Sequence, residues 1–393
     1  MYCIRKHFLL DKSYFIYINQ DSIDIGEVIF WLIVKSNQKI KYAIPMNLQT
    51  IIDWKVNREN QKLEAFAVRW KGKWKFFYAD QNVLLRVKEH MDRKVAYKSM
   101  DSFFTITEKI EATQQSSILL VQRNENEQIF VCKEMKKLKK YSQLLFQNEV
   151  EALKQLSHKN LVKLIEVYES EEQYSIVMEY LKGGSLNQCL KYCKLKNREV
   201  DVIIQQIMEG INYIHQSGFV HRDMKPDNIV FNDLGQFSQL KIIDFGITKR
   251  IEDLEKEKDM KFGTPGYMAP EIFDYKQKIT EKVDIFACGV MLYQMLTGQK
   301  LIPGSSSKLI QENNKNFNLS NQILSKIKHP DFRILVSQML EKDPEKRISA
   351  LQTLNYLNLM KIPSVAVSTS IQILHHHEPV QQLPNFKKLI DKQ

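Results

Sequence analysis

The stretch His221-Arg222-Asp223-Met224-Lys225-Pro226-Asp227-Asn228 decides how this sequence is interpreted. It is followed by Asp244-Phe245-Gly246 and then by Gly263-Thr264-Pro265-Gly266-Tyr267-Met268-Ala269-Pro270-Glu271. A lone Asp-Phe-Gly tripeptide arises easily by chance, but three such motifs in this order do not. Their carboxylates, amide and lysine are groups that position phosphates and hard metal ions.

These motifs resemble those of the eukaryotic protein kinases, and the resemblance covers roughly residues 102–361. It implies an α+β, bilobal kinase fold with a small β-rich N-lobe and a large helical C-lobe. We therefore divide the chain into an N-terminal domain (1–97), a linker (98–103), a kinase domain (104–361, with the lobes meeting near residue 180) and a flexible tail (362–393).

The resemblance also indicates the subclass. Lys225, two places after Asp223, and Gly263-Thr264-Pro265 are similar to serine/threonine kinases rather than tyrosine kinases. The stretch Val177-Met178-Glu179-Tyr180 looks most like the group regulated by calcium and calmodulin, although no acidic calcium loop is present. We expect Ser or Thr hydroxyls of proteins to be the substrates, in a signalling role.

The family match implies a role for each catalytic residue. Asp223 would accept or orient the proton of the substrate hydroxyl, and Lys225 would neutralise the moving phosphate. Asn228 and Asp244 would be ligands of Mg²⁺. Asp284 resembles an aspartate that supports the catalytic loop, and Arg347 resembles the ion-pair partner of Glu271; both are structural.

Upstream, the apolar run Ile129-Phe130-Val131-Cys132 leads to Lys133, which matches the lysine that holds the inner phosphates of ATP. Glu149 stands where its ion-pair partner is expected, and Glu151, on another helix face, is the alternative. The apolar strand Tyr174 to Met178 would lead into the adenine-binding hinge. The expected nucleotide-binding residues are Ile110, Ile118, Cys132, Lys133, Met178, Glu179, Leu181 and Val230, and the expected cofactors are ATP and Mg²⁺.

The glycine-rich loop departs from the family pattern. Glu111, Thr113 and Ser116 occupy the three glycine places, so side chains stand where backbone amides usually approach the phosphates. A flexible loop tolerates small residues, and the other catalytic residues are intact, so we expect an active kinase. The alternatives are a pseudokinase scaffold and a membrane adaptor led by the N-terminal domain.

The activation segment departs as well. Residues 249–263 contain no Ser, Thr or Tyr, so a phosphorylation switch has no acceptor there. Arg222, which pairs with the phosphate in phosphorylated relatives, would meet a carboxylate such as Asp259 instead; a solvated charged loop is the alternative. The N-terminal domain would then regulate the kinase activity.

Alternating residues predict strands around Phe8–Leu10, Tyr14–Ile18, Ile29–Val34 and Ile40–Ile44. Phe66, Val68, Trp70 and Trp74, Phe76, Tyr78 flank Lys71-Gly72-Lys73 and predict a hairpin with one aromatic face. A helix capped by Asp80 follows, with apolar residues Val83, Leu84, Val87, Met91 and Val95. This order resembles a pleckstrin-homology-like barrel closed by a helix, which implies anionic lipid, a peptide or the neighbouring kinase domain as partner.

Composition supports a soluble globular protein, with 44% apolar and 26% charged residues. Residues 1–100 hold 18 Lys and Arg against 10 Asp and Glu, hence +8 of the total +11, but no nucleic-acid reader motif is present. The five cysteines show neither a disulfide framework nor zinc-site spacing. With no signal peptide or transmembrane segment indicated, we expect a cytoplasmic protein that the N-terminal domain recruits to membranes if it binds lipid.

Overall fold

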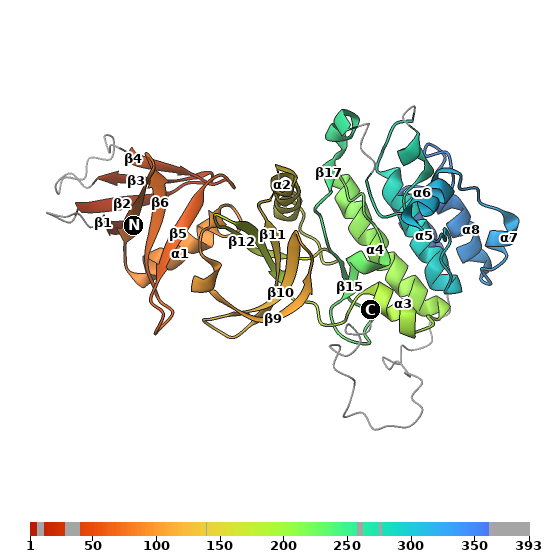
Figure 1. Ribbon diagram of the computed structural model, residues 1–393, viewed down its shortest axis with the longest axis horizontal. Helices are drawn as coiled ribbons and strands as arrows, with labels where there is room; N and C mark the ends of the chain where they lie inside the picture. The colour runs from red at the N-terminus through yellow and green to blue at the C-terminus, as the bar shows by residue number, and fades with distance from the viewer. Residues whose placement is uncertain (6–11, 28–39, 139, 258–261, 275–276, 361–393) are drawn as a thin grey trace, which may run out of the picture.

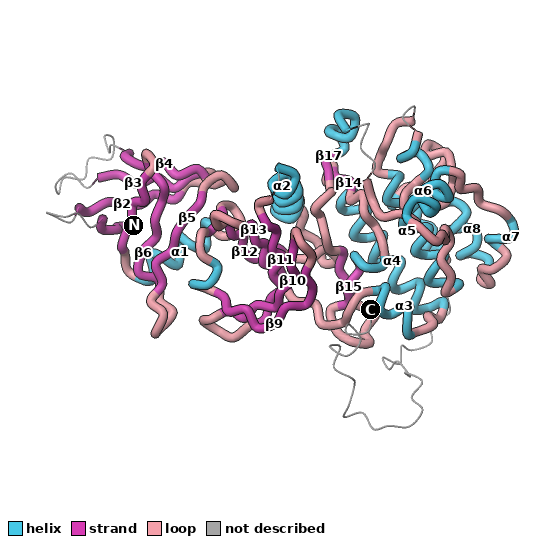
Figure 2. Tube along the Cα trace, in the orientation of Figure 1, coloured by secondary structure: helices cyan, strands magenta, loops and turns pink. Residues whose placement is uncertain are grey.

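The computed structural model describes residues 1–5, 12–27, 40–138, 140–257, 262–274 and 277–360. An N-terminal module, a small lobe and a large lobe follow one another along the long axis (Figure 1). Strands dominate the first two parts and helices the third, as Figure 2 shows. The strands expected at 8–10 and 29–34 and the tail at 362–393 lie outside the described residues.

The N-terminal module is an antiparallel meander followed by a helix. Each of β1 to β4 pairs with its neighbour in the chain, β5 pairs with β6, β6 with β7, and β1 also with β7. Among the described residues β4 and β5 are not paired, so the expected closed barrel is not observed. The elements are β1 (Tyr2–Arg5), β2 (Lys12–Ile18), β3 (Ser22–Glu27), β4 (Ile40–Pro45), β5 (Ile51–Val56), β6 (Leu63–Trp70), β7 (Lys73–Tyr78) and α1 (Gln81–Met91).

The hairpin of β6 and β7 forms, but its aromatic face differs from the prediction. Lys71 and Gly72 form a two-residue turn with φ of 49° and 77°, so Trp70 pairs with Lys73 and Phe66 pairs with Phe77. Phe77 is therefore the fully buried aromatic residue of β7, whereas Trp74, Phe76 and Tyr78 are half-buried. Because strand side chains alternate, a turn shorter by one residue exchanges the two faces.

The helix α1 buries a narrower apolar stripe than the sequence pattern indicated. Leu84, Val87 and Met91 are fully buried, whereas Val83 is half-buried and Val95 lies beyond the helix end. Full burial of one such side chain stabilises a fold by about 1.5–3 kcal/mol. Lys88, on the same face, is also buried and therefore requires a partner.

One partner, Asp92, lies one turn further along the chain, and the other lies in the small lobe, whose sheet is continuous with that of the module. The two-residue strand β8 (Ala96–Tyr97) runs parallel to β5 on one side and to β12 on the other. The strand order is therefore β4-β3-β2-β1-β7-β6-β5-β8-β12-β13-β11-β10-β9. The small lobe comprises β9 (Phe104–Ala112), β10 (Ser116–Arg123), β11 (Ile129–Lys136), α2 (Lys140–Gln155), β12 (Leu164–Glu169) and β13 (Gln173–Glu179), and the expected linker contains a short turn, η1 (Met100–Ser102).

A buried ion-pair cluster joins the two parts. Lys88 Nζ and Arg123 Nη2 lie 2.9 and 3.0 Å from Glu166 Oε1, and the Tyr168 hydroxyl also donates to Glu166. Burial raises the pKa of Glu166, but the charges of Lys88 and Arg123 outweigh this effect and lower it. Aromatic residues surround the cluster, with Tyr97 edge-on to Tyr168 at 5.8 Å. The module and the small lobe therefore share one core.

The large lobe is built around α5 (Lys282–Thr297), which is buried on nearly all sides and is therefore a core helix. None of the described helices combines the length and the apolar run needed to cross a bilayer. The remaining elements are α3 (Leu186–Tyr192), α4 (Asn197–Gln216), β14 (Phe219–Val220), η2 (Pro226–Asn228), β15 (Ile229–Phe231), β16 (Leu240–Ile242), β17 (Lys249–Arg250), η3 (Ile251–Glu257), η4 (Pro270–Phe273), α6 (Ser307–Lys315), α7 (Asn321–Leu324), α8 (Pro330–Met339) and α9 (Ala350–Leu359).

Candidate active site

The loop between β14 and β15 carries the first motif and is held by α5. The Asp284 carboxylate accepts hydrogen bonds from the backbone amides of His221 (2.9 Å) and Arg222 (2.8 Å) and from His215 Nε2 (2.9 Å). Burial raises the pKa of Asp284, but the hydrogen bond from His215 outweighs it and lowers the value. Arg222 has a φ of 70°, a backbone conformation that is sparsely populated for residues other than glycine. Asp284 therefore stabilises a strained loop, in the supporting position expected for it.

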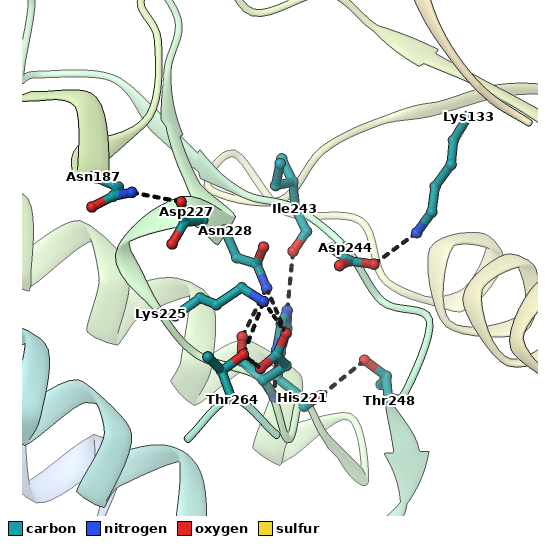
Figure 3. Close-up of polar contacts among 11 residues, drawn as sticks. Lys133, Asn187, His221, Lys225, Asp227, Asn228, Ile243, Asp244, Thr248 and Thr264 are labelled. Carbon is teal, nitrogen blue, oxygen red and sulfur yellow. Dashed lines mark hydrogen bonds and ion pairs between the residues drawn. The ribbon is translucent and has the colours of Figure 1, made fainter. Parts of the chain in front are cut away.

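Asp223 lies within a compact polar triangle with Lys225 and Thr264, which Figure 3 shows pointing toward one another. Lys225 Nζ is 2.6 Å from Asp223 Oδ2, and the Thr264 hydroxyl donates to Asp223 Oδ1 at 2.6 Å. Lys225 Nζ also reaches Thr264 Oγ1 at 3.0 Å. Thr264 was not among the predicted site residues, although the motif Gly263-Thr264-Pro265 was the signal that could have identified it. The triangle fixes both oxygens of the candidate general base.

Asn228 and Asp244 supply the oxygens that suit a magnesium ion. The Asn228 amide donates to the Asp223 carbonyl oxygen at 2.8 Å, so its Nδ2 is engaged and its Oδ1 is available as a ligand. Burial raises the pKa of Asp244, but the charge and hydrogen bond of Lys133 outweigh it and lower the pKa to about 2. Asp244 is therefore ionised at neutral pH. Two hard oxygen donors fit Mg²⁺, which takes its other ligands from phosphates and water.

Among the described residues, no group of three or more His, Cys, Asp or Glu is arranged to hold a metal ion. A self-contained metal cage is therefore not observed in this part of the chain.

Lys133 on β11 and Glu149 on α2 form the expected ion pair. Lys133 Nζ lies 2.8 and 3.0 Å from the two Glu149 oxygens and 2.7 Å from Asp244 Oδ1. Burial lowers the pKa of Lys133, but the two carboxylates outweigh it and raise the value, so the ammonium stays charged. The alternative partner, Glu151, instead pairs with Arg250 at 3.2 Å. The helix α2 is therefore in contact with the site.

The structure places most predicted nucleotide-binding residues around these groups. Ile118 on β10 lies opposite Lys133 in the sheet, Met178 and Glu179 end β13, and Val230 lies on β15. Ile110 lies on β9, and Leu181 comes two residues after the end of β13. The Glu179 side chain is already engaged, since it accepts from the Lys163 amide (2.7 Å) and from Lys241 Nζ (2.9 Å). Its backbone amide also donates to the Lys163 carbonyl oxygen at 3.1 Å.

The structure contradicts the prediction that Cys132 contacts the nucleotide. It is fully buried with Met100 in the core shared with the N-terminal module, on the face of β11 opposite Lys133. Strand side chains alternate, so Val131 and not Cys132 shares the face of Lys133. Burial also raises the pKa of the Cys132 thiol, as expected for a structural cysteine.

The side chain of Thr113 closes the turn between β9 and β10. The Thr113 hydroxyl accepts from the backbone amides of Gln115 (3.2 Å) and Ser116 (3.0 Å), and the Thr113 amide donates to the Ser116 carbonyl (2.8 Å). These are amides that a glycine loop would present to phosphates. Here they are already hydrogen-bonded, so fewer donors face a nucleotide.

The activation segment contacts the catalytic loop through an aromatic residue. The Arg222 guanidinium lies 4.3 Å from the ring centre of Phe262, and its Nε donates to the Ile247 carbonyl at 2.5 Å. The expected contact with Asp259 lies outside the described residues. A cation–π contact of this kind contributes about 0.5–2 kcal/mol.

Two lobes that bring a paired lysine, a loop aspartate and two magnesium-type oxygens together define an enzyme of the phosphotransferase class. A family model described as protein kinase domain matches residues 104–357, and the chain belongs to the protein kinase family. This confirms the resemblance drawn from the motifs.

Curated relatives include three proteins named myosin light chain kinase 3. The one from Homo sapiens is 35% identical over 226 residues, which is 56% of this chain and 27% of the relative. Those from Pongo abelii and Mus musculus are 34% and 33% identical over 233 residues, which is 58% of this chain and 28% of each relative. The match thus spans little more than a quarter of the length of these relatives.

Proposed function

We propose that this chain is an ATP-dependent protein serine/threonine kinase of the calcium/calmodulin-dependent-kinase-like group. The observation that carries the proposal is the intact polar chain from Glu149 through Lys133 to Asp244, with Asp223 and Asn228 in contact beside it. The relatives, by their printed name, are kinases that act on myosin light chains. For this chain we propose that the phosphate acceptors are Ser and Thr hydroxyls of proteins, and we name no particular substrate.

The proposed mechanism follows from these contacts. Asp223 accepts the proton of the substrate hydroxyl through its carboxylate, of which Lys225 holds one oxygen and Thr264 the other. Lys133 holds the inner phosphates of ATP, because Glu149 keeps its ammonium fixed and charged. Asn228 and Asp244 would hold Mg²⁺, which neutralises the charge of the phosphates when bound. Lys225 stabilises negative charge on the transferred group.

The direct test is phosphate incorporation from labelled ATP with magnesium into a generic basic protein and into the chain itself. We expect phosphoserine and phosphothreonine after acid hydrolysis, and no incorporation when EDTA removes the metal. A well-folded chain that binds ATP but transfers no phosphate would instead be a pseudokinase. The hydrogen-bonded turn at Thr113 is the observation that favours this second function.

The same turn gives a prediction for nucleotide affinity. In the double variant Thr113→Gly and Ser116→Gly, the amides of Gln115 and Ser116 lose their internal acceptor and turn toward the phosphates. We expect the KM for ATP to fall about two- to tenfold, the equivalent of one hydrogen bond. Steady-state kinetics would measure it, with Thr105→Gly as the control, because Thr105 contacts Asn124 away from the turn. An unchanged or higher KM would contradict the assignment.

Activity should not depend on phosphorylation of the activation segment. Residues 249–263 contain no acceptor, and Phe262 contacts Arg222 where a phosphate would otherwise act. We expect phosphatase treatment to leave kcat/KM unchanged, and Phe262→Ala to lower it up to about tenfold through loss of the cation–π contact. Kinetics of the treated parent and of the variant would show this. A treated parent that loses activity and regains it on rephosphorylation of Thr248 or Thr264, which flank this segment, would overturn the prediction.

For residues 1–97 we propose a pleckstrin-homology-like module that supports the kinase domain through its shared core. The five cysteines are all free, which suits a reducing compartment, and we propose a cytoplasmic location on that basis.

The central contact of this module gives a stability prediction. Glu166→Gln leaves half-buried Arg123 without this carboxylate and buried Lys88 with Asp92 alone, so we expect the free energy of unfolding to fall by about 1.5–3 kcal/mol. Urea unfolding would measure it. The control Glu169→Gln on the same strand breaks the more exposed pair with Lys137 and should cost less than about 1 kcal/mol. Equal losses in the two variants would argue against a junction held by Glu166.

A further inference from the structure

A cavity of about 410 Å³ lies where the N-terminal module, the small lobe and the large lobe meet. Its walls are the turn after α1, the end of α2 with the chain up to β12, and the strand β16. None of the catalytic residues Asp223, Lys225 and Asn228 lines the cavity, so it is separate from the active site.

Basic side chains dominate its lining. The basic residues of the lining are one arginine, four lysines and one histidine: Arg93, Lys94, Lys154, Lys163, Lys241 and His158. The single acidic residue among the lining residues is Asp92. Its carboxylate is already engaged by Lys88 Nζ at 2.8 Å and by the Tyr97 hydroxyl at 2.6 Å.

Most of these charges are not balanced locally. Lys241 pairs with Glu179 at 2.9 Å. Within the described part of the chain, no carboxylate forms an ion pair with Arg93, Lys94, Lys154 or Lys163. Glu151 and Glu209 act on Lys154 and His158 only at a distance, and each has its own cation in Arg250 and Lys159.

One contact brings two of these cationic residues together. Lys154 Nζ donates to the Lys94 carbonyl oxygen at 2.9 Å, which holds the end of α2 against the module. Burial and then the charge of Lys94 lower the pKa of Lys154. Arg93 has a φ of 64°, a conformation uncommon for a residue with a side chain. Two cations held close together without a counter-charge destabilise the fold. A bound anion would remove this repulsion.

We propose that this cavity binds a small molecule carrying several phosphate groups and that the bound anion joins the N-terminal module to the kinase domain. The volume lies in the range of about 300–1,000 Å³ common for ligand pockets. Several cations from separate chain segments suit several phosphates, because each charge-assisted hydrogen bond then ties another segment to the same ligand. A free inositol phosphate and the headgroup of a phosphorylated lipid share this chemistry.

The position of the site connects it to the catalytic groups. Lys154 and Glu149 lie on the same helix, α2, and Lys241 on β16 comes three residues before Asp244. An anion held by Arg93, Lys94 and Lys154 would therefore fix the helix that carries Glu149. The binding itself does not depend on phosphoryl transfer, so its test is independent of the proposed kinase activity.

The test is calorimetric titration of the full chain with inositol hexakisphosphate, without ATP and at fixed ionic strength. We expect one saturable site. The double variant Arg93→Gln and Lys94→Gln should bind at least about tenfold more weakly, the equivalent of one lost charged hydrogen bond. The matched control is Lys308→Gln with Lys315→Gln on the exposed part of α6, which removes the same charge and should leave affinity unchanged.

Thermal unfolding of the same proteins gives a second readout and controls for folding. Without ligand, Arg93→Gln with Lys94→Gln should have a melting temperature equal to or above that of the parent, because repulsion with Lys154 is relieved. The same variant should lose the ligand-induced rise in melting temperature that the parent shows. No saturable binding by the parent, or equal weakening by both double variants, would overturn the proposal.

Sedimentation with vesicles separates the two sources of phosphate. Phosphatidylcholine vesicles with and without phosphatidylinositol bisphosphate are compared, with soluble inositol hexakisphosphate as competitor. Vesicle binding that needs the phosphorylated lipid, is displaced by the competitor and is lost in Arg93→Gln with Lys94→Gln identifies a lipid headgroup. Binding of the soluble anion alone, lost in the same variant, identifies a free ligand. Vesicle binding that survives both treatments counts against this cavity.

Discussion

Asp223→Asn is expected to lower kcat for phosphoryl transfer by about 10²–10⁴-fold, because an amide cannot accept the proton of the substrate hydroxyl. The asparagine keeps the shape of the side chain and one oxygen for Lys225 or Thr264. Nucleotide binding should therefore persist, since Lys133, Glu149 and Asp244 are untouched. Incorporation of labelled phosphate and fluorescence titration with a nucleotide analogue would measure the two quantities separately.

Asp233→Asn provides the matched control for this substitution. It makes the same chemical change at an exposed position beyond β15 and should leave kcat within a factor of about two, as expected for a surface residue. If Asp223→Asn retained the activity of this control, Asp223 would not be the base, and the proposed mechanism would fail.

The second large effect concerns stability. Arg347 and Glu271 form a bidentate ion pair, with Nη1–Oε1 and Nη2–Oε2 distances of 2.5 and 3.0 Å, and both side chains are inaccessible to solvent. Arg347→Met leaves the Glu271 carboxylate buried without its cation. We expect the free energy of unfolding to fall by about 3–5 kcal/mol, measured by urea unfolding.

Two further variants make this measurement decisive. The neighbouring Lys346→Met breaks an exposed pair with Asp343 and should cost less than about 1 kcal/mol. Adding Glu271→Leu to Arg347→Met should restore part of the loss, because the unpaired buried charge is then removed. If Arg347→Met were as stable as Lys346→Met, the buried pair would not hold the large lobe together.

The sequence predicted the active site better than its surroundings, for a physical reason. Asp223, Asn228 and Asp244 belong to motifs in which the chemistry requires particular side chains at particular spacings. Cys132 was misplaced because the strand lies between two cores, so its continuous apolar run does not show which face meets the nucleotide. Phe77 was missed because one residue of turn length decides the face of a whole strand.

Contacts of single polar residues were harder to foresee. Thr113 and Thr264 are small hydroxyl residues whose hydrogen bonds depend on folded geometry and leave no periodic pattern. Glu166 looks like an interruption in an apolar strand, and only its contact with Lys88 of the module explains it. β8 has two residues, too few for any alternation to predict a strand.

This short strand also changes where the folding unit of the kinase begins. The family match starts at residue 104, yet β12 pairs with β8, and Tyr168, Phe130 and Val177 pack in a core whose other half comes from the N-terminal module. A fragment starting at residue 104 would expose an unpaired strand edge and this apolar face to solvent. Such surfaces promote self-association, so we expect a stable fragment with the kinase domain to need residues upstream of the boundary that the family defines.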